Sequence, residues 1–441
     1  MMRICHLAAG AGNMYCGACV RDAAMARALI AEGHEVQIIP LYTPLRVESG
    51  EMPPVAPVHL GAVNAYLQQL SPVFTRLPGP LARLLDHEGL LRWLSRFAVS
   101  TKPSELGPMT VSVLAGEDGR QRAEIDQLLC YLEREVRPDA VSITNSLLSG
   151  VTPAIKRRLG LPILCEVKGE DGFIEGIPEP YRSRGIELMR RNARFVDRFI
   201  SPTQGYIARM SDFLQVETER FEVVRSIVDA EAFARSTDRM REPLTIGYVS
   251  VITARKGLHV AVEALAHLVR EGYDARLRVA GQVLDRKYWR EIRRTLRREA
   301  LTERFEYLGE VDFLAKVDLM RSLSAFCAPA IKPEALGTSA LEAMAAGVPV
   351  VVPDDGVFPE TLALTEGGLL FEPASAESLA AAIARLADDP DAADAMGVAG
   401  MHGIAEHFSA ASAAAQMERI LETLADAADH GEGVPDGEEA L

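Results

Sequence analysis

The stretch KPEALGTSALEAMAAGVPVV, residues 332–351, runs from a turn into a helix and on into a strand. Gly337 is suited to the turn, and the residues from Thr338 onward can start a helix. Gly347 then ends the helix, and the apolar run over 348–352 is typical of a buried strand. The first N–H groups of a helix have no partner within it and lie at the positive end of its dipole. This stretch therefore predicts an anion site at the helix start.

Two carboxylates flank that helix start, Glu334 before the glycine turn and Glu342 within the first turns of the helix. Both would repel a phosphate unless each accepted hydrogen bonds from hydroxyl groups. A nucleotide sugar carries hydroxyls on its ribose and its hexose, with a diphosphate between them, so it fits this spacing. The alternative is that both are simply acidic residues of the kind favoured near a helix N-terminus.

A basic element, Arg255-Lys256-Gly257, follows the apolar run that begins at Leu244. Ligands of parallel α/β sheets bind at the carboxyl ends of the strands, so these cations are expected at a ligand-binding edge. There they can neutralise a diphosphate leaving group. A solvated basic helix start is the alternative, although cations are disfavoured at a helix N-terminus.

The whole chain alternates short apolar runs with helical stretches. Near the N-terminus, the run over 3–9 leads into Gly10-Ala11-Gly12-Asn13, a helical stretch over 21–32 and a strand over 35–40. This order predicts parallel sheets, and 441 residues suffice for two α/β domains. The polar stretch over 229–243 is the expected linker region.

Composition excludes several classes of protein. The formal net charge of −15 opposes general binding to nucleic acid, and six cysteines are too few for a disulfide scaffold. No apolar run reaches the roughly 18 residues of a membrane helix, so we expect a cytoplasmic protein.

The region over 63–102 is locally basic with apolar residues at helical spacing. It predicts a helical insertion, with an acceptor-facing lid or a peripheral membrane contact as alternatives.

Several spaced motifs in the second half resemble the donor domain of retaining glycosyltransferases of family four, which have the GT-B fold. Their E-x7-E signature corresponds to Glu334 and Glu342, and their KG turn corresponds to Lys256-Gly257. Other matches are EAMA-x-G-x-PVV over 342–351, Gly-Glu-Val over 309–311 and Gly-x-x-Pro-Glu over 356–360. The first half resembles the family less specifically, through Gly10-Ala11-Gly12 and GHEV over 33–36.

The resemblance implies an α/β protein with two facing Rossmann-like domains, parallel sheets and a C-terminal helix that crosses back to the first domain. We expect an acceptor-side domain over 1–215, a nucleotide-sugar donor domain over 216–408, the returning helix over 409–428 and an acidic disordered tail over 429–441.

The resemblance also assigns roles at the donor site. Lys256 would contact the donor diphosphate, Glu342 the ribose hydroxyls and Glu334 the transferred sugar. The other donor-binding residues that it implies are Gly12, Arg255, Gly309, Val311, Leu336, Gly337, Thr338 and Ser339. Family members usually have an Arg five residues before the Lys, and this chain has Val251 there. Arg255 is the candidate replacement.

Acceptor-side residues are predicted less directly. Family members often use a His in the acceptor domain, but no His lies between His87 and His259. At the corresponding strand ends the chain has Asn145-Ser146 and Glu170-Asp171. We take Glu170 and Asp171 as catalytic candidates beside Glu334 and Lys256, and Asn13, Asn145 and Ser146 as acceptor-side candidates. The alternative is that they are turn and helix-cap residues.

The mechanism that the resemblance implies is a metal-independent hexosyl transfer with retention and without a protein nucleophile or a cofactor. The partners would be a nucleotide sugar and a small-molecule, glycan or lipid acceptor. Another GT-B reaction, by an epimerase or a phosphorylase, and a noncatalytic nucleotide-sugar binding protein are the alternatives. The motifs do not indicate the donor base, the sugar, the acceptor or the oligomeric state.

Two further patterns near the N-terminus are candidate redox or cofactor sites. Cys16-Gly-Ala-Cys19 has the spacing of a redox pair, with packing or lining of the acceptor side as the other interpretation. Gly10-x-Gly12 is followed by Tyr15 where a dinucleotide fingerprint has a third glycine, which disfavours NAD. The chain has no P-loop motif, which excludes an ATPase of that kind.

Overall fold

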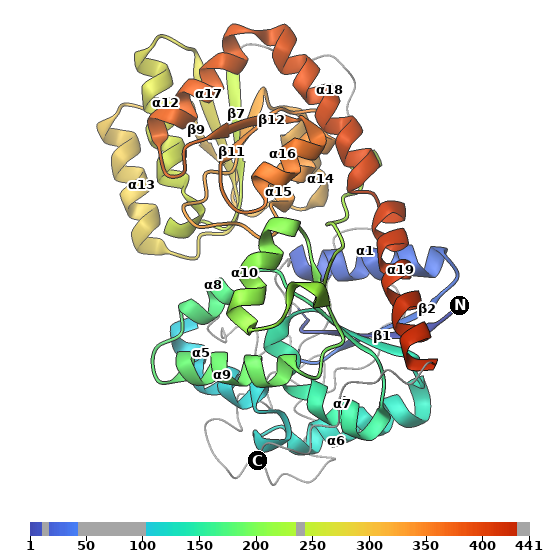
Figure 1. Ribbon diagram of the computed structural model, residues 1–441. Coiled ribbons are helices and arrows are strands. Elements are labelled where there is room, and N and C mark those ends of the chain that lie inside the picture. The colour runs from blue at the N-terminus through green and yellow to red at the C-terminus, as the bar shows by residue number, and fades with distance from the viewer. Residues whose placement is uncertain (11–16, 43–102, 235–242, 430–441) are drawn as a thin grey trace. The chain divides into compact units, whose positions relative to one another are not determined.

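The computed structural model describes residues 1–10, 17–42, 103–234 and 243–429 (Figure 1). They form two compact units. The N-terminal unit contains the described parts of 1–201, residues 207–224 and the C-terminal helix from Ala413 onward. The C-terminal unit contains residues 202–206 and the described parts of 225–412. The change from the N-terminal to the C-terminal unit after residue 224 thus comes before the polar stretch over 229–243 that was expected as the linker. Residues 235–242 of that stretch lie outside the described residues.

The N-terminal unit is built on a six-stranded sheet in which every pairing is parallel. Its order is β2-β1-β3-β4-β5-β6. The strands are β1 (Arg3–Ala8), β2 (Glu35–Pro40), β3 (Ala140–Ile143), β4 (Ile163–Glu166), β5 (Arg198–Ser201) and β6 (Phe221–Val223). β3 and β4 are buried along their whole length, which explains why they have no alternation of polar and apolar residues.

Helices flank this sheet. They are α1 (Gly17–Ala31), α5 (Pro103–Leu114), α6 (Arg122–Tyr131), α7 (Thr152–Leu159), α8 (Glu170–Glu175), α9 (Tyr181–Ala193), α10 (Gln204–Leu214) and α19 (Ala410–Asp429). α7 has a proline in its first turn and is followed by Gly160, whose φ of 65° suits the residue after a helix C-terminus. α19 buries Ala413, Met417 and Leu424 along one stripe, which holds it on the N-terminal unit.

The C-terminal unit has a second six-stranded parallel sheet, ordered β12-β11-β10-β7-β8-β9. The strands are β7 (Leu244–Val249), β8 (Ala275–Ala280), β9 (Phe305–Tyr307), β10 (Ala325–Cys327), β11 (Val350–Pro353) and β12 (Gly368–Phe371). The helices are α11 (Ala230–Phe233), α12 (Leu258–Arg270), α13 (Arg286–Arg298), α14 (Phe313–Arg321), α15 (Thr338–Ala345), α16 (Phe358–Thr365), α17 (Ala376–Asp388) and α18 (Pro390–His407).

Two apolar clusters cover the faces of this second sheet. Val351 of β11 belongs to the cluster with α12 and α17, whereas Val350 and Val352 belong to the cluster with α14 and α15. Successive side chains of a strand point to opposite faces, so the continuous apolar run over 348–352 buries both faces of β11.

The predicted α/β fold with two parallel-sheet domains and a returning C-terminal helix is confirmed. The helix expected over 21–32 begins earlier, at Gly17. The basic region over 63–102 and residues 430–441 of the acidic tail lie outside the described residues. Asp429, counted with the tail in the sequence, is the last residue of α19. Among the helices that the structure describes, none is long and apolar enough to span a bilayer.

Candidate active site

The start of α15 has the geometry of an anion site. Gly337 precedes the helix with a φ of 59°, and a Cβ there would lie 2.8 Å from the Phe358 ring. A glycine is therefore needed for both conformation and space. The first backbone bonds run from the N–H groups of Ala340 and Leu341 to the Gly337 carbonyl. The N–H groups of Thr338 and Ser339 come before these bonds, at the positive end of the helix dipole.

Glu334 and Lys256 meet beside this helix start. The Lys256 ammonium lies 2.7 Å from both carboxylate oxygens of Glu334. The Glu334 backbone is fixed by Gly356-Val357, because the Val357 N–H donates to its carbonyl at 2.9 Å. A Cβ at Gly356 would come within 2.7 Å of Glu334 backbone atoms, so this close approach requires glycine.

The KG turn is equally constrained. Lys256 ends a short 3-10 helix, and Gly257 follows with a φ of 72°. A Cβ at Gly257 would lie 1.7 Å from the Pro329 carbonyl oxygen. The Arg255 carbonyl accepts from the Ile331 N–H at 3.0 Å, while the Arg255 side chain is exposed. The turn after β7 is thus held against the loop that follows β10.

Glu342 is a buried carboxylate with a lysine partner that the sequence did not reveal. The Lys316 ammonium lies 2.8 Å from one Glu342 oxygen, and the two side chains are 13% and 11% exposed. Lys316 also lies over the rings of Phe233 and Phe313. It comes from α14, outside every motif, so only the tertiary structure shows this pair.

Three loops at the carboxyl ends of β7, β8 and β9 lie close together. The Gly281 N–H donates to the Gly309 carbonyl at 2.7 Å, and a Cβ at Gly281 would lie 1.9 Å from the Ser250 carbonyl oxygen. Val311 packs against the neighbouring core. Val251, at the position where an Arg is usual, is 39% exposed.

The structure also brings together two of the acceptor-side candidates in the N-terminal unit. Glu170 is buried and accepts hydrogen bonds from the N–H groups of Ser146 at 3.2 Å and Lys168 at 2.7 Å. Burial raises the pKa of Glu170 to about 7, although the backbone N–H groups oppose this shift.

Asn145 and Asp171 have structural partners. The Asn145 side chain accepts from the Leu147 N–H at 3.1 Å and caps the 3-10 helix over Ser146–Val151, as the alternative interpretation of this residue expects. The Asp171 carboxylate accepts from the Arg209 guanidinium. Gly12, Asn13 and Cys16 lie outside the described residues, and Cys19 falls within α1.

A buried charge cluster in the same unit was not predicted. The Lys168 ammonium contacts Asp22 at 2.9 Å and Glu166 at 3.1 Å, and Arg21 contacts Glu166 at 3.2 Å. His6 joins the cluster through Asp22 at 3.4 Å. Lys168 and His6 lower the pKa of Asp22 although burial opposes this, and the two carboxylates raise the pKa of Lys168 against the effect of burial. The residues come from β1, α1, β4 and the loop that follows β4, so no local motif connects them.

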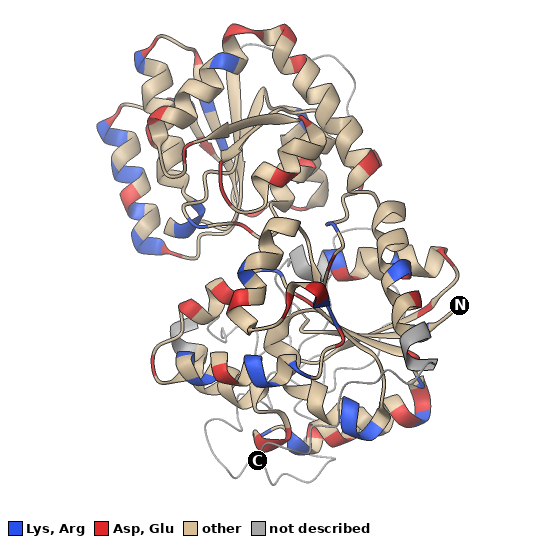
Figure 2. Cartoon of the chain, in the orientation of Figure 1, with Lys and Arg blue, Asp and Glu red and all other residues tan. Residues whose placement is uncertain are grey.

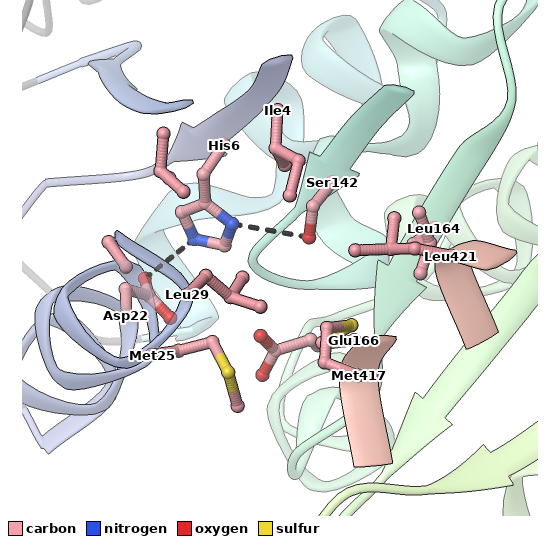
Figure 3. Close-up of a pocket in the computed structure, with 12 residues that line it drawn as sticks. Ile4, His6, Asp22, Met25, Leu29, Ser142, Leu164, Glu166, Met417 and Leu421 are labelled. Carbon is pink, nitrogen blue, oxygen red and sulfur yellow. Dashed lines mark hydrogen bonds and ion pairs between the residues drawn. The ribbon is translucent and has the colours of Figure 1, made fainter. Parts of the chain in front are cut away.

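Figure 3 shows His6 and Glu166 lining a small cavity beneath α19, with Met417 and Leu421 on its apolar side. Its volume of about 20 Å³ holds at most a water molecule. His6, Asp22 and Glu166 have ligand atoms within 4.8 Å of one another, as a metal site requires. Lys168 and Arg21 already neutralise both carboxylates, however, so a divalent cation would add excess charge to a buried cluster. The cluster fits a structural role better than a metal site.

Comparisons with known proteins match both α/β units of the chain to glycosyltransferases. A family model described as "Glycosyl transferases group 1" matches residues 229–402, and one described as "Glycosyl transferase 4-like domain" matches residues 17–226. A crystal structure of HepE from Anabaena in complex with UDP has a TM-score of 0.66 and 17% identity. The match covers 96% of this chain and 100% of HepE, and shows likeness of fold.

Two curated relatives are more similar in sequence. Phosphatidyl-myo-inositol mannosyltransferase of Mycobacterium leprae is 32% identical over 173 residues, which are 39% of this chain and 44% of the relative. 2-deoxystreptamine glucosyltransferase of Streptomyces kanamyceticus is 31% identical over 215 residues, which are 45% of this chain and 54% of the relative. The chain spans about half the length of these two relatives.

Proposed function

We propose that this chain is a GT-B glycosyltransferase of the family-four type, as the two matching family models support, and that it transfers a hexosyl group from a nucleotide sugar to an acceptor hydroxyl. We further propose that the transfer retains the anomeric configuration and needs no metal ion. The acceptor is a small molecule, a glycan or a lipid. The phosphatidyl-myo-inositol mannosyltransferase and 2-deoxystreptamine glucosyltransferase relatives indicate by their names that both lipid and small-molecule acceptors occur among similar proteins.

The observation that carries the proposal is the contact of Lys256 with Glu334 beside the start of α15. An ammonium, a carboxylate and a helix N-terminus together match a diphosphate that is joined to a hydroxyl-bearing sugar. The phosphates would take hydrogen bonds from the first amides of α15 and from Lys256. Glu334 would then accept hydrogen bonds from the sugar hydroxyls.

The same arrangement supports a specific course of reaction. The bond between the anomeric carbon and the diphosphate oxygen breaks, and the bond to the acceptor oxygen forms on the same face of the sugar. The acceptor proton passes to a diphosphate oxygen, so the products are a glycoside and a nucleoside diphosphate. Lys256 and the α15 dipole stabilise the negative charge that develops on the leaving group. Glu334 would stabilise the positive charge that develops on the sugar.

The remaining predicted residues have supporting roles in the proposal. Glu342, held by Lys316, would accept hydrogen bonds from the ribose hydroxyls. The loop over 309–311 would contact the base. In the N-terminal unit, Glu170 is the proposed acceptor-side carboxylate, because it is buried at the start of α8 and its pKa is raised to about 7. Above that pKa the ionised carboxylate would accept a hydrogen bond from the acceptor hydroxyl.

The proposal is tested first by binding. UDP-, GDP-, ADP- and dTDP-sugars are added separately while thermal unfolding of the full chain is followed. A donor that binds the folded state raises the melting temperature by mass action. We expect one of the four classes to do so in wild type and to have a reduced effect in Lys256→Ala. No shift with any nucleotide sugar would contradict the proposal.

Turnover is tested second, with the donor found by the panel. Release of the nucleoside diphosphate is measured with candidate acceptors, with and without a chelator, and the anomeric configuration of the product is determined by NMR. We expect an unchanged rate with the chelator and the same configuration in product and donor. Inversion, or a rate that depends on a divalent metal, would overturn that part of the proposal. Binding without release of diphosphate would favour a noncatalytic nucleotide-sugar binding protein.

A further inference from the structure

Helix α13 of the C-terminal unit carries an unusual concentration of positive charge. Seven of its 13 residues are Lys or Arg, and its one acidic residue is Glu291. The cations are all exposed: Arg286, Lys287, Arg290, Arg293, Arg294, Arg297 and Arg298. Figure 2 shows them as a blue series along this helix. The whole chain has a formal net charge of −15, so the series is a local reversal of sign.

The cations occupy one face of the helix. At about 100° per residue, they fall within an arc of about 140° around the helix axis. The opposite face buries Tyr288, Ile292 and Leu296 in the core of the unit. α13 is thus anchored by its apolar face and presents a basic face over a length of about 20 Å. We call this basic face the α13 surface.

The fold does not explain these charges. Among the described residues, Arg298 is the one cation of the α13 surface in an ion pair, with Glu299 at 2.9 Å. Arg290, Arg294 and Arg298 follow one another at i,i+4 spacing, where like charges destabilise a helix. Uncharged polar residues at these positions would give the same packing without the repulsion. A ligand with many negative charges would remove the repulsion.

Apolar side chains border the α13 surface. Leu284, just before the helix, is 44% exposed, and Tyr307 of β9 is 37% exposed. The Tyr307 ring lies 4.6 Å from the Trp289 ring, centroid to centroid. Leucine and aromatic side chains that flank a row of cations suit the boundary between lipid headgroups and acyl chains. They add little to contacts with the phosphates of a nucleic acid, which the net charge of −15 also disfavours.

We propose that the α13 surface binds anionic lipid bilayers and attaches the C-terminal unit to them reversibly. The apolar face of α13 is already packed in the core, so the helix lies on the headgroups and does not insert. Attraction between exposed charges is screened within about 8 Å at physiological ionic strength, so the attachment is sensitive to salt. This proposal is independent of the sugar-transfer activity, because it concerns none of the donor-site residues.

The test is co-sedimentation of the full chain with vesicles. Vesicles of phosphatidylcholine alone are compared with vesicles that also contain phosphatidylglycerol, at low and at high salt. We expect wild type to bind the anionic vesicles at low salt and to be released at high salt. Equal binding to both kinds of vesicle, or no binding to the anionic ones, would overturn the proposal. A duplex DNA or RNA that binds more tightly than the vesicles would show that the α13 surface serves nucleic acid instead.

Variants locate the contact. The triple change Arg290→Gln, Arg294→Gln and Arg297→Gln neutralises the middle of the α13 surface, and we expect a loss of partitioning of about a hundredfold. The matched control neutralises Arg122, Arg134 and Arg276, three exposed arginines elsewhere, and should bind like wild type. Arg→Lys at the three α13 positions should retain most of the binding because it keeps the charge. Equal losses in the α13 variant and the control would place the contact elsewhere.

Discussion

The candidate donor site contains two pairs of oppositely charged side chains that the fold holds in contact. Lys256 and Glu334 meet at 2.7 Å, and Lys316 and Glu342 meet at 2.8 Å. In each pair the carboxylate belongs to the E-x7-E signature. The lysines differ, because Lys256 belongs to a motif and Lys316 does not. The sequence motifs therefore include both carboxylates and one of their lysine partners, and only the tertiary structure shows the other lysine.

Lys256→Ala and Glu334→Ala should each slow sugar transfer by about a hundredfold or more. The proposed roles are to stabilise the separated charges of the transition state, and loss of one such group has effects of this size in other enzymes. The measurement is the rate of nucleoside diphosphate release with donor and acceptor present. Arg276→Ala serves as the control, since this exposed arginine lies near the amino end of β8. Rates like wild type in both site variants would refute the assignment.

Lys316→Met should raise the KM for the donor about tenfold or more and lower stability by on the order of 3 kcal/mol, because it removes one partner of a buried ion pair. The double variant Lys316→Met with Glu342→Gln removes the unbalanced charge. We expect it to regain stability and to keep the high KM, as shown by thermal unfolding and donor titration. A normal KM in Lys316→Met would mean that this lysine does not position Glu342 for the ribose.

The pH dependence of transfer tests the role of Glu170. With a pKa of about 7, this group is protonated below pH 7 and ionised above it. If the ionised form orients the acceptor, the rate should rise as the pH increases through about 7 and then level off. Glu170→Gln should abolish that rise, whereas Glu175→Gln, an exposed carboxylate on the same helix, should keep it. A profile that is the same in wild type and Glu170→Gln would restrict Glu170 to a structural role.

At the scale of elements, glycines fix the loops that carry the site. Gly257, Gly337 and Gly356 all have positive φ, and at each of them a Cβ would collide with a neighbouring loop or side chain. The sequence motifs include these glycines because no other residue allows such close approach. The strands were predictable for a related reason: β11 is buried on both faces and reads as a continuous apolar run.

Gly337→Ala tests whether the turn before α15 requires glycine. The residue has a φ of 59°, and the new Cβ would lie 2.8 Å from the Phe358 ring. The backbone conformation alone should cost about 1–2 kcal/mol of stability, and the collision should shift the start of α15 and weaken nucleotide binding. Gly272→Ala is the control, because Gly272 has a φ of 96° and nothing within 4 Å of the added Cβ. Calorimetric titration with the donor should separate them, and equal affinities would contradict the proposed role of the turn.

The buried charge cluster and the α13 surface could not be predicted from sequence patterns. The cluster of His6, Asp22, Glu166 and Lys168 joins β1, α1 and the end of β4 with the loop after it, segments that are far apart in the chain. Parallel pairing brings them together, and their spacing in the sequence follows no rule. The basic character of α13 is visible in the sequence, but its significance depends on knowing that its apolar face is buried and its cations are exposed.

In the molecule as a whole, the predicted donor-side and acceptor-side residues that the structure describes lie on separate units, each built on one six-stranded parallel sheet. The C-terminal unit contains every described donor-site residue, and the N-terminal unit contains the described acceptor-side candidates. The alternation of strands and helices predicted this division into two α/β domains. The same alternation did not predict that α19, the last described helix, belongs to the N-terminal unit, where its buried Ala, Met and Leu side chains pack. These side chains form no recognisable motif, so this expectation came from the resemblance to family four.

The proposed function requires that the start of α15 holds the diphosphate of a nucleotide sugar. Amide hydrogen exchange of the full chain can detect this contact, with the nucleoside diphosphate of the donor that the thermal panel identifies and the same nucleoside without phosphates as the control. We expect the diphosphate to slow exchange at the amides of residues 336–340 and the nucleoside alone to leave it unchanged. Unchanged exchange over 336–340 with saturating diphosphate, or equal protection by the nucleoside alone, would contradict it.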